Sequence, residues 1–257
     1  MRRAIALVRA VLNTSLLLLV PLALALEPPS AGLTIVVSQD GSGAYTEIQR
    51  AIDDSKPGDT IFIKNGSYRE DVVVHSKNRL TLKGQTRDAV IIQGLKRVGA
   101  FRIGKWPYGA NDIEIRDLSV SENGGLAVGI FNGTHIRLSN VRVHGLVYVQ
   151  QATHVRIEHS ELGGSETIGV SFADAQAELL KSAIRNNDYG VTIAGKSDVR
   201  VEENFFEKNA YDAVAVEAGA KAIIIGNTIV KGTGAIRVDD KAQAEVRDNK
   251  IYAGERP

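Results

Sequence analysis

The chain has 257 residues, of which 44% are hydrophobic and 24% are charged, a length that suits one domain of moderate to large size. Its formal net charge of +1 excludes a bulk electrostatic attraction to nucleic acid or to an anionic membrane, so neither is expected as a partner. The chain contains no cysteine, which excludes disulfides and thiolate chemistry.

Residues 1–25 have the pattern of a secretory signal peptide. Three arginines near the start form a basic region, a short apolar core follows, and Ala23-Leu24-Ala25 matches an A-x-A cleavage site. The alternative is a membrane anchor, but the unbroken apolar run is shorter than the roughly 20 residues that a spanning helix needs. We therefore expect a secreted or periplasmic protein that keeps no stable membrane anchor after cleavage.

Residues 26–257 are expected to form one domain that opens with a strand and a covering helix. Residues 33–37 alternate as a strand does, and apolar residues recur at helical spacing over 46–54, with Thr46 as the expected N-cap. An open end of stacked strands offers unpaired backbone groups to other chains. The segment 33–59 is therefore expected to cover the first coil of the domain.

The second half of the chain repeats itself at a nearly constant interval. Asn204, Asn227 and Asn249 are almost equally spaced along the sequence, and each follows a pair of alternating apolar residues. A fixed period of this length is typical of repeat architectures, and the alternation predicts strands rather than helices. Each repeat is then a coil of short strands that buries its apolar side by stacking on its neighbours.

Coil starts can be placed along most of the domain, at nearly equal intervals. Only the first interval, from Arg79 to Asp112, is clearly longer than the others, and its excess falls in 93–99 and 104–111. This spacing predicts eight to nine coils, each with three short strands. The starts lie near Arg79, Asp112, His135, His154, Ala177, Asp198, Lys221 and Gln243.

The opening of the domain resembles a known group of proteins. Residues 37–52 (VSQDGSGAYTEIQRAI), 57–70 (PGDTIFIKNGSYRE) and 80–84 (LTLKG) are similar to the start of secreted proteins of the pectin-lyase-like group. That group includes pectin methylesterases, pectate lyases and non-enzymatic members such as the periplasmic accessory protein of nitrous-oxide reductase. The resemblance implies an all-β fold, namely a single-stranded right-handed parallel β-helix with three short parallel sheets and a short N-terminal capping helix.

The resemblance also implies where chemistry would occur, on the outer face of the first sheet and the loops around it. The outward positions predicted there are Val73, Arg102, Gly129, Tyr148, Ser171, Thr192, Ala215 and Arg237, and one pleat further His75, Gly104, Phe131, Gln150, Ala173, Ala194, Glu217 and Asp239.

No catalytic residue carries over from the resemblance. The methylesterase pattern needs a glutamine–aspartate motif, a second aspartate in an apolar strand and an arginine beside tryptophan, and none is found; Gln150-Gln151 is followed by Ala-Thr. A calcium site of the pectate-lyase kind would need clustered acids, but the centre of the first sheet carries small uncharged residues. We therefore expect no cofactor and no metal, and calcium has no support in the residues.

Asp188, Asp212 and Arg237 are the catalytic candidates that the spacing favours. The two aspartates belong to successive coils, and a pair of close carboxylates can divide into an acid and a base because one charge raises the other's pKa. Arg237 could bind the carboxylate of an acidic sugar bidentately. The alternative is that both aspartates are turn residues that bond the local backbone.

Aromatic and polar residues around the same face are the substrate-binding candidates. The insertion 104–111 holds the only tryptophan of the chain, and flat amphipathic rings suit sugar rings. The alternative is that Trp106 folds back over the wide early coil. The full set is Arg102, Trp106, Tyr108, Tyr148, Gln150, Glu166, Tyr189 and Tyr211.

Two further features are expected to be structural. The three asparagines should form a hydrogen-bonded ladder at one turn, limited to three rungs because Leu118, Val141 and Ser160 occupy the column before it. His135 and His154 share a coil position beside Arg137 and Arg156. Stacked like charges are unfavourable, which could indicate a bound anion. The alternative is a solvated charged face, in which Glu114 and Glu158 compensate the arginines.

The residues leave two functional hypotheses open. The first is an exported β-helix protein that recognises an acidic polysaccharide, with catalysis as a lyase, esterase or hydrolase left undecided. The second is a non-enzymatic accessory or adhesive protein, whose partner is another envelope component. The C-terminal end of the coil stack either pairs with a second copy or is guarded by its charged residues.

Overall fold

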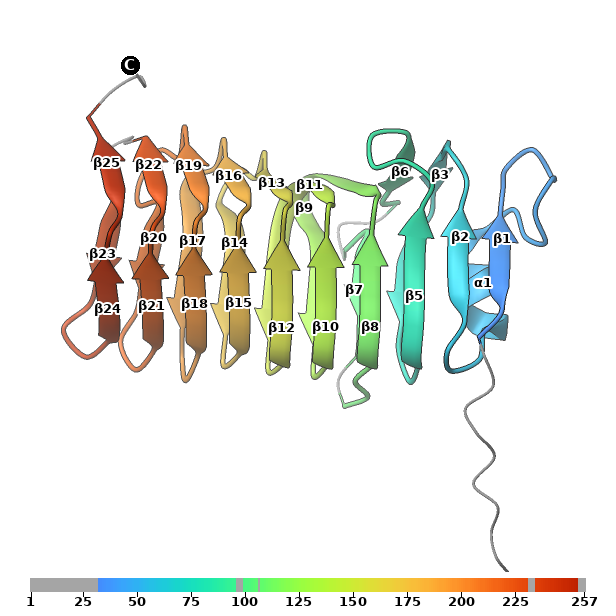
Figure 1. Ribbon diagram of the computed structural model, residues 1–257, viewed down its shortest axis with the longest axis horizontal. Coiled ribbons are helices and arrows are strands. Elements are labelled where there is room, and N and C mark those ends of the chain that lie inside the picture. Colours follow the sequence, from blue (N-terminus) through green and yellow to red (C-terminus); the bar gives the residue numbers. More distant parts are fainter. Residues whose placement is uncertain (1–31, 96–98, 106, 231–233, 254–257) are drawn as a thin grey trace, which may run out of the picture. The chain divides into compact units, whose positions relative to one another are not determined.

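The computed structural model describes residues 32–95, 99–105, 107–230 and 234–253, so the expected signal peptide lies outside the described residues. Within them the chain forms 25 strands and one helix, wound as a right-handed parallel β-helix (Figure 1). Among the described residues, no helix is long and apolar enough to cross a membrane.

Ten parallel strands stack side by side in the second sheet, which faces the viewer in Figure 1. The number is higher than the eight to nine coils expected because the two strands before the first counted coil are full members of the stack. In order they are β1 (Thr34–Val37), β2 (Thr60–Ile63), β5 (Asn78–Gly84), β8 (Asn111–Arg116), β10 (Thr134–Ser139), β12 (Thr153–Glu158), β15 (Gln176–Leu180), β18 (Asp198–Glu202), β21 (Lys221–Ile225) and β24 (Gln243–Arg247).

The first and third sheets are two columns of one 15-stranded sheet, because β9 (Ser119–Phe131) and β11 (Arg142–Gln150) run unbroken through both. The first sheet contains β4 (Val72–Val74), β7 (Phe101–Ile103), the ends of β9 and β11, β14 (Ile168–Ala173), β17 (Tyr189–Ala194), β20 (Val214–Val216) and β23 (Ile236–Val238). The third contains β3 (Gly66–Arg69), β6 (Val90–Gln93), the starts of β9 and β11, β13 (Glu161–Gly163), β16 (Ala183–Arg185), β19 (Phe205–Glu207), β22 (Thr228–Val230) and β25 (Lys250–Tyr252).

The core is a set of aliphatic stacks that run from coil to coil. Leu138, Ile157, Leu179 and Val201 are successive partners in the second sheet, and all are buried. Fully burying such a side chain stabilises the fold by about 1.5–3 kcal/mol. At the last described coil the corresponding Val246 is 46% exposed, because no further described strand covers it.

The capping helix is present, but the expected N-cap is wrong. Helix α1 (Ile48–Asp54) begins after Glu47, which makes no side-chain capping bond. Instead the carboxylate of Glu70 accepts the backbone N–H groups of Ile48 and Gln49, each at 2.9 Å. A carboxylate from a neighbouring coil thus satisfies the free amides and the positive end of the helix, which sequence adjacency could not reveal.

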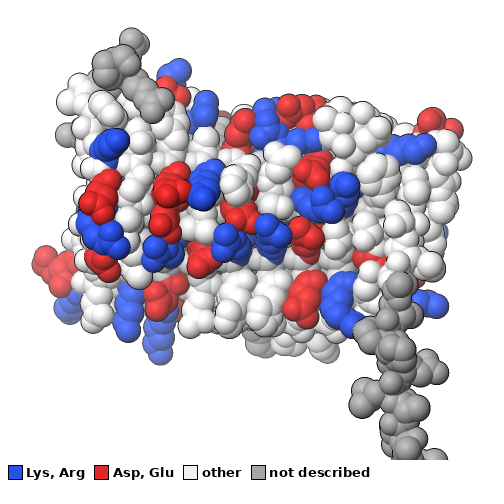
Figure 2. Space-filling view, in the orientation of Figure 1, with Lys and Arg blue, Asp and Glu red and all other residues white. Residues whose placement is uncertain are grey.

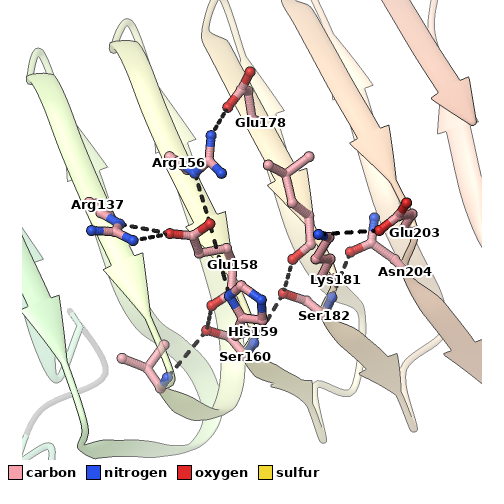
Figure 3. Close-up of polar contacts among 12 residues, drawn as sticks. Arg137, Arg156, Glu158, His159, Ser160, Glu178, Lys181, Ser182, Glu203 and Asn204 are labelled. Carbon is pink, nitrogen blue, oxygen red and sulfur yellow. Dashed lines mark hydrogen bonds and ion pairs between the residues drawn. The ribbon is translucent and has the colours of Figure 1, made fainter.

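The asparagine side chains lie in one column, and each rung bonds the next. Asn204 Nδ2 donates to Asn227 Oδ1 at 3.1 Å, and Asn227 Nδ2 donates to Asn249 Oδ1 at 2.9 Å. The column is longer than the three rungs expected, because the backbone N–H of Ser182 donates to Asn204 Oδ1 and that of Ser160 donates to Ser182 Oγ (Figure 3). Serine hydroxyls therefore continue the role of the amides upstream.

Candidate functional site

A cleft of about 630 Å³ opens on the outer face of the first sheet, over β4, β7, β9 and β11. The predicted outward column is in register: Val73 pairs with Arg102, Arg102 with Gly129, and Gly129 with Tyr148. The lining side chains come from successive coils and from α1, and they include Gln49, Asp71, His75, Arg102, Lys105, Phe131 and Gln150.

Helix α1 forms one wall of this cleft through Gln49. Its side-chain Oε1 accepts the N–H of Val73 at 2.7 Å, and its Nε2 donates to the carbonyl of Val73 at 3.2 Å. Gln49 thus pairs with β4 as a preceding strand would. Nearby, Asp71 also lines the cleft, and its Oδ1 accepts the backbone N–H of Leu95 at 2.8 Å.

Arg102 is the side chain of the cleft whose bonding is incomplete. It is half-buried, its Nε is buried, and no described residue accepts a hydrogen bond from that atom. No ion pair holds its guanidinium among the described residues either, unlike the arginines of the second sheet discussed below. A buried donor without a partner is costly, by about 1–3 kcal/mol.

The opposite side of the cleft is aromatic. A Cβ placed on Gly129 would lie 2.4 Å from Cε2 of Phe131, so the glycine is what allows the Phe131 ring to lie back over β9. Phe131 in turn meets Tyr148 edge-on, with ring centroids 6.0 Å apart. The predicted Tyr148 therefore supports the wall, while Gln150, its neighbour on β11, reaches the cleft itself.

The insertion 104–111 lies beside the cleft. Lys105 lines it, and the N–H of Lys105 donates to the carbonyl of Tyr108 at 2.6 Å in a tight turn that leaves Tyr108 63% exposed. Trp106 lies outside the described residues. Glu166, on a later coil, is exposed and is not among the described residues that line the cleft.

The structure brings Asp212 and Arg237 together, but as an ion pair. Arg237 Nε donates to Asp212 Oδ2 at 2.9 Å, and the same guanidinium also bonds Asp239. The hydrogen bond to Asp212 raises the pKa of Arg237 above its usual value. Two carboxylates already occupy this arginine, so it lacks the open fork that binding a sugar carboxylate would need.

The Asp188 carboxylate makes no hydrogen bond or ion pair with a described residue, and nothing joins it to Asp212. Its backbone carbonyl accepts the N–H of Tyr211 at 2.7 Å. The Tyr189 and Tyr211 rings stack at 5.0 Å with a tilt of 33°, and Tyr211 is 50% exposed. The beginning of this turn is structural, because Asn187 Nδ2 donates to Asn209 Oδ1 at 3.0 Å in a second amide ladder. Asn187 and Asn209 are one full coil apart in the sequence, so this second ladder could have been inferred from their spacing.

The second sheet carries a band of alternating acidic and basic side chains, which crosses the face shown in Figure 2. At its centre Glu158, 4% exposed, accepts hydrogen bonds from Arg137 at 2.7 Å and Arg156 at 2.9 Å (Figure 3). Burial favours the neutral form of Glu158, but these bonds outweigh it and lower its pKa. Arg156 also bonds Glu178 at 2.8 Å, so the arginines of this face are compensated.

The imidazole rings of His135 and His154, near the start of β10 and β12, stack with centroids 4.7 Å apart and planes 24° apart. His135 Nδ1 lies 3.5 Å from Asp112 Oδ1. The part of the chain that the structure describes contains no group of three or more His, Cys, Asp or Glu side chains placed to hold a metal ion.

Comparison of the sequence with family models gives two partial matches. A pectinesterase model matches residues 34–124, and a model of the right-handed β-helix region matches residues 144–256. No curated protein matches the sequence significantly.

Solved structures share the fold at low identity. Pectin methylesterase PemA from Erwinia chrysanthemi has a TM-score of 0.65 and 12% identity, covering 88% of this chain and 90% of that one. The alginate lyase from Paenibacillus sp. str. FPU-7 has a TM-score of 0.59 and 12% identity, over 86% and 96% of the two chains. PfbA, a surface adhesin of Streptococcus pneumoniae, has a TM-score of 0.65 and 14% identity, over 80% and 67%. The chain is therefore a right-handed parallel β-helix protein with the pectin-lyase-like fold.

Proposed function

We propose that this is an exported protein that recognises an acidic polysaccharide, and that a segment of the polymer binds in the first-sheet cleft. The observation that carries the proposal is Arg102, which lines the cleft and whose guanidinium forms no ion pair with a described residue. A guanidinium matches a planar carboxylate, which it binds through two parallel hydrogen bonds. Each uronic acid ring carries one such carboxylate.

The rest of the cleft suits a sugar bound in this way. Lys105 adds a second positive charge, the Phe131 ring gives an apolar surface, and Gln150 can both donate to and accept from hydroxyl groups. The volume of about 630 Å³ lies within the range of roughly 300–1,000 Å³ that is usual for small-ligand sites. Pectin and alginate, the polymers named for two of the similar structures, are both rich in uronic acids.

The test is calorimetric titration with tetragalacturonate and with a mannuronate tetramer. We expect the Arg102→Gln variant to bind at least about tenfold more weakly, since one charged hydrogen bond contributes roughly 1.5–3 kcal/mol. Arg247→Gln is the matched control, because Arg247 is exposed, bonds Glu245 at 2.6 Å and is remote from the cleft lining. Absence of binding by the unmodified protein, or equal losses in the two variants, would refute the proposal.

A second observation favours a protein that recognises the polysaccharide without catalysing a reaction on it. The outward residues in the middle of the first sheet are Ser171, Ala173, Thr192 and Ala194, none of which ionises. An accessory or adhesive protein needs only the binding cleft. Incubation with pectate, methyl-esterified pectin and alginate should then release neither unsaturated ends nor methanol. Turnover that disappears on substitution of Asp71, His75 or Lys105, the titratable residues of the cleft, would instead establish an enzyme.

A further inference from the structure

A second hollow, of about 440 Å³, lies on the outer face of the second sheet. It is separate from the first-sheet cleft and shares no lining residue with it. Its polar lining comes from β12, β15 and β18 and consists of His154, Arg156, Gln176, Glu178, Asp198 and Arg200.

The hollow exists because a stack of bulges stops. Asp112, His135 and His154 each have φ of 54° and are inserted residues that the strand pairing skips. Thr134 pairs with Thr153 and Ile136 with Val155, so His135 and His154 between them are left out of the ladder. The next strand, β15, has no inserted residue, since Gln176 and Ala177 pair directly with Asp198 and Val199. The column of inserted side chains therefore ends at His154, and a step is left over β15.

The imidazole of His154 forms the wall of this step. One face of the ring stacks on His135, and the ring also lines the hollow on the side of β15, where no further inserted residue follows. An imidazole presents an apolar face and a polar edge. A ligand ring can therefore continue the stack in the place of a missing side chain.

The surrounding polar groups are of two kinds. Arg156 is fixed by Glu158 and Glu178, and Arg200 by Glu202 at 2.5 Å, so their positions are set before a ligand arrives. The side chains of Gln176 and Asp198 make no hydrogen bond or ion pair with any described residue. They are free to bond a ligand.

We propose that this hollow binds a neutral sugar ring, stacked on His154 and hydrogen-bonded by Gln176 and Asp198. Two guanidinium groups and two carboxylates line it, so their charges cancel. Donors and acceptors alternate around an apolar face, which matches a ring that carries hydroxyl groups on its edge and C–H groups on its face. A charged ligand of either sign would meet like charge on one side of the hollow.

The test is a titration followed by NMR, with cellotriose, mannotriose and galactotriose as neutral probes and trigalacturonate as the acidic one. We expect at least one neutral trisaccharide to shift the amide signals of residues 154, 176 and 198. We expect His154→Asn to weaken that binding about fivefold or more and Asp198→Ala about tenfold. Asparagine tolerates the left-handed backbone conformation, so the first variant removes the ring alone.

His159→Asn is the matched control, because His159 is an exposed histidine with φ of 51° that does not line this hollow. It should bind the neutral probe as the unmodified protein does, and so should Arg102→Gln. The proposal is overturned if none of the three neutral probes binds at millimolar concentration. It is also overturned if trigalacturonate alone shifts these residues, or if His154→Asn and His159→Asn have the same effect. Loss of acidic-glycan binding in the first-sheet cleft has no bearing on these outcomes.

Discussion

The regular coils from residue 134 onward and the irregular coils before it treat polar side chains differently. In the regular coils a nearly constant coil length places like positions above one another, so Asn227 meets Asn249 and Glu158 meets two arginines. In the early coils the insertion 104–111 and the long strand β9 interrupt this stacking, and Arg102 has no partner among the described residues. At Asn227 and Glu158 repetition therefore supplies the partners, whereas at Arg102 its interruption leaves the guanidinium without an ion pair to a described residue.

The largest loss of stability is expected from Asn227→Leu. Asn227 is fully buried, accepts the N–H of Asn204 at 2.9 Å and donates to the carbonyl of Val201 at 2.9 Å. Leaving both groups unsatisfied should lower the free energy of unfolding by about 3 kcal/mol, measured by denaturant titration. Asn249→Leu, at a half-buried rung, should cost about 1 kcal/mol. Equal losses would mean that the ladder does not depend on burial.

Glu158→Gln should rank second, at about 2 kcal/mol. Breaking a buried ion pair costs about 3–5 kcal/mol, and solvent around Arg137 and Arg156, 53% and 46% exposed, reduces that figure. Glu245→Gln, which removes an exposed partner of Arg247, should cost close to nothing. Equal losses of unfolding free energy in Glu158→Gln and Glu245→Gln would show that burial does not distinguish the members of the charged band.

The same substitution has a consequence for acid stability. The folded pKa of Glu158 is lowered, so its contribution is fully present above the unfolded value near 4.5 and is lost as the pH falls through the folded pKa. Below about pH 4.5 the unfolded state binds more protons, and stability falls with pH. Unfolding free energies from pH 7 to 3 should decline less steeply in Glu158→Gln than in the unmodified protein.

A smaller effect is expected for Asp212→Asn, about 0.5 kcal/mol, because Arg237 is 44% exposed and keeps its bond to Asp239. Asp188→Asn, which removes no contact of that carboxylate with a described residue, should leave the melting temperature unchanged. A larger loss for Asp188 than for Asp212 would contradict the observed pairing.

Little loss of stability is expected for Arg102→Gln. The substitution removes no ion pair with a described residue and also removes the buried, unpaired Nε, so the unfolding free energy should not fall by more than about 0.5 kcal/mol. Binding of tetragalacturonate should nevertheless fall. A loss above about 1 kcal/mol without any loss of binding would show that Arg102 belongs to the framework, and the contrast between the two regions would fail.

The sequence was sufficient for the winding and for most of the register. The alternation of apolar residues, together with the sheet arrangement that the resemblance implies, placed Val73, Arg102, Gly129 and Tyr148 in one column, and the structure has them there. These features depend on local periodicity, which a single sequence carries in full. The helix cap was missed because Glu70 reaches the helix from another coil.

The candidate site was predicted less well, because it depends on which polar groups meet. Asp239 follows Arg237 closely in the sequence, just after β23, and Asp212 lies one coil earlier, so their ion pairs could have been inferred. The availability of Arg102 could not, since it depends on what adjacent irregular coils fail to supply. The serine rungs were missed because a hydroxyl can replace an amide at the same turn.

The amide ladder also sets the unit by which this fold can change in length. Asn204 and Asn227 make the same three kinds of bond to the coils on either side, so the two are interchangeable in their surroundings. An excision of residues 205–227 would bring Asn204 against Asn249 with no change in the pattern of bonds. Whole turns can thus be duplicated or deleted during evolution, whereas a partial turn would leave buried amides without partners.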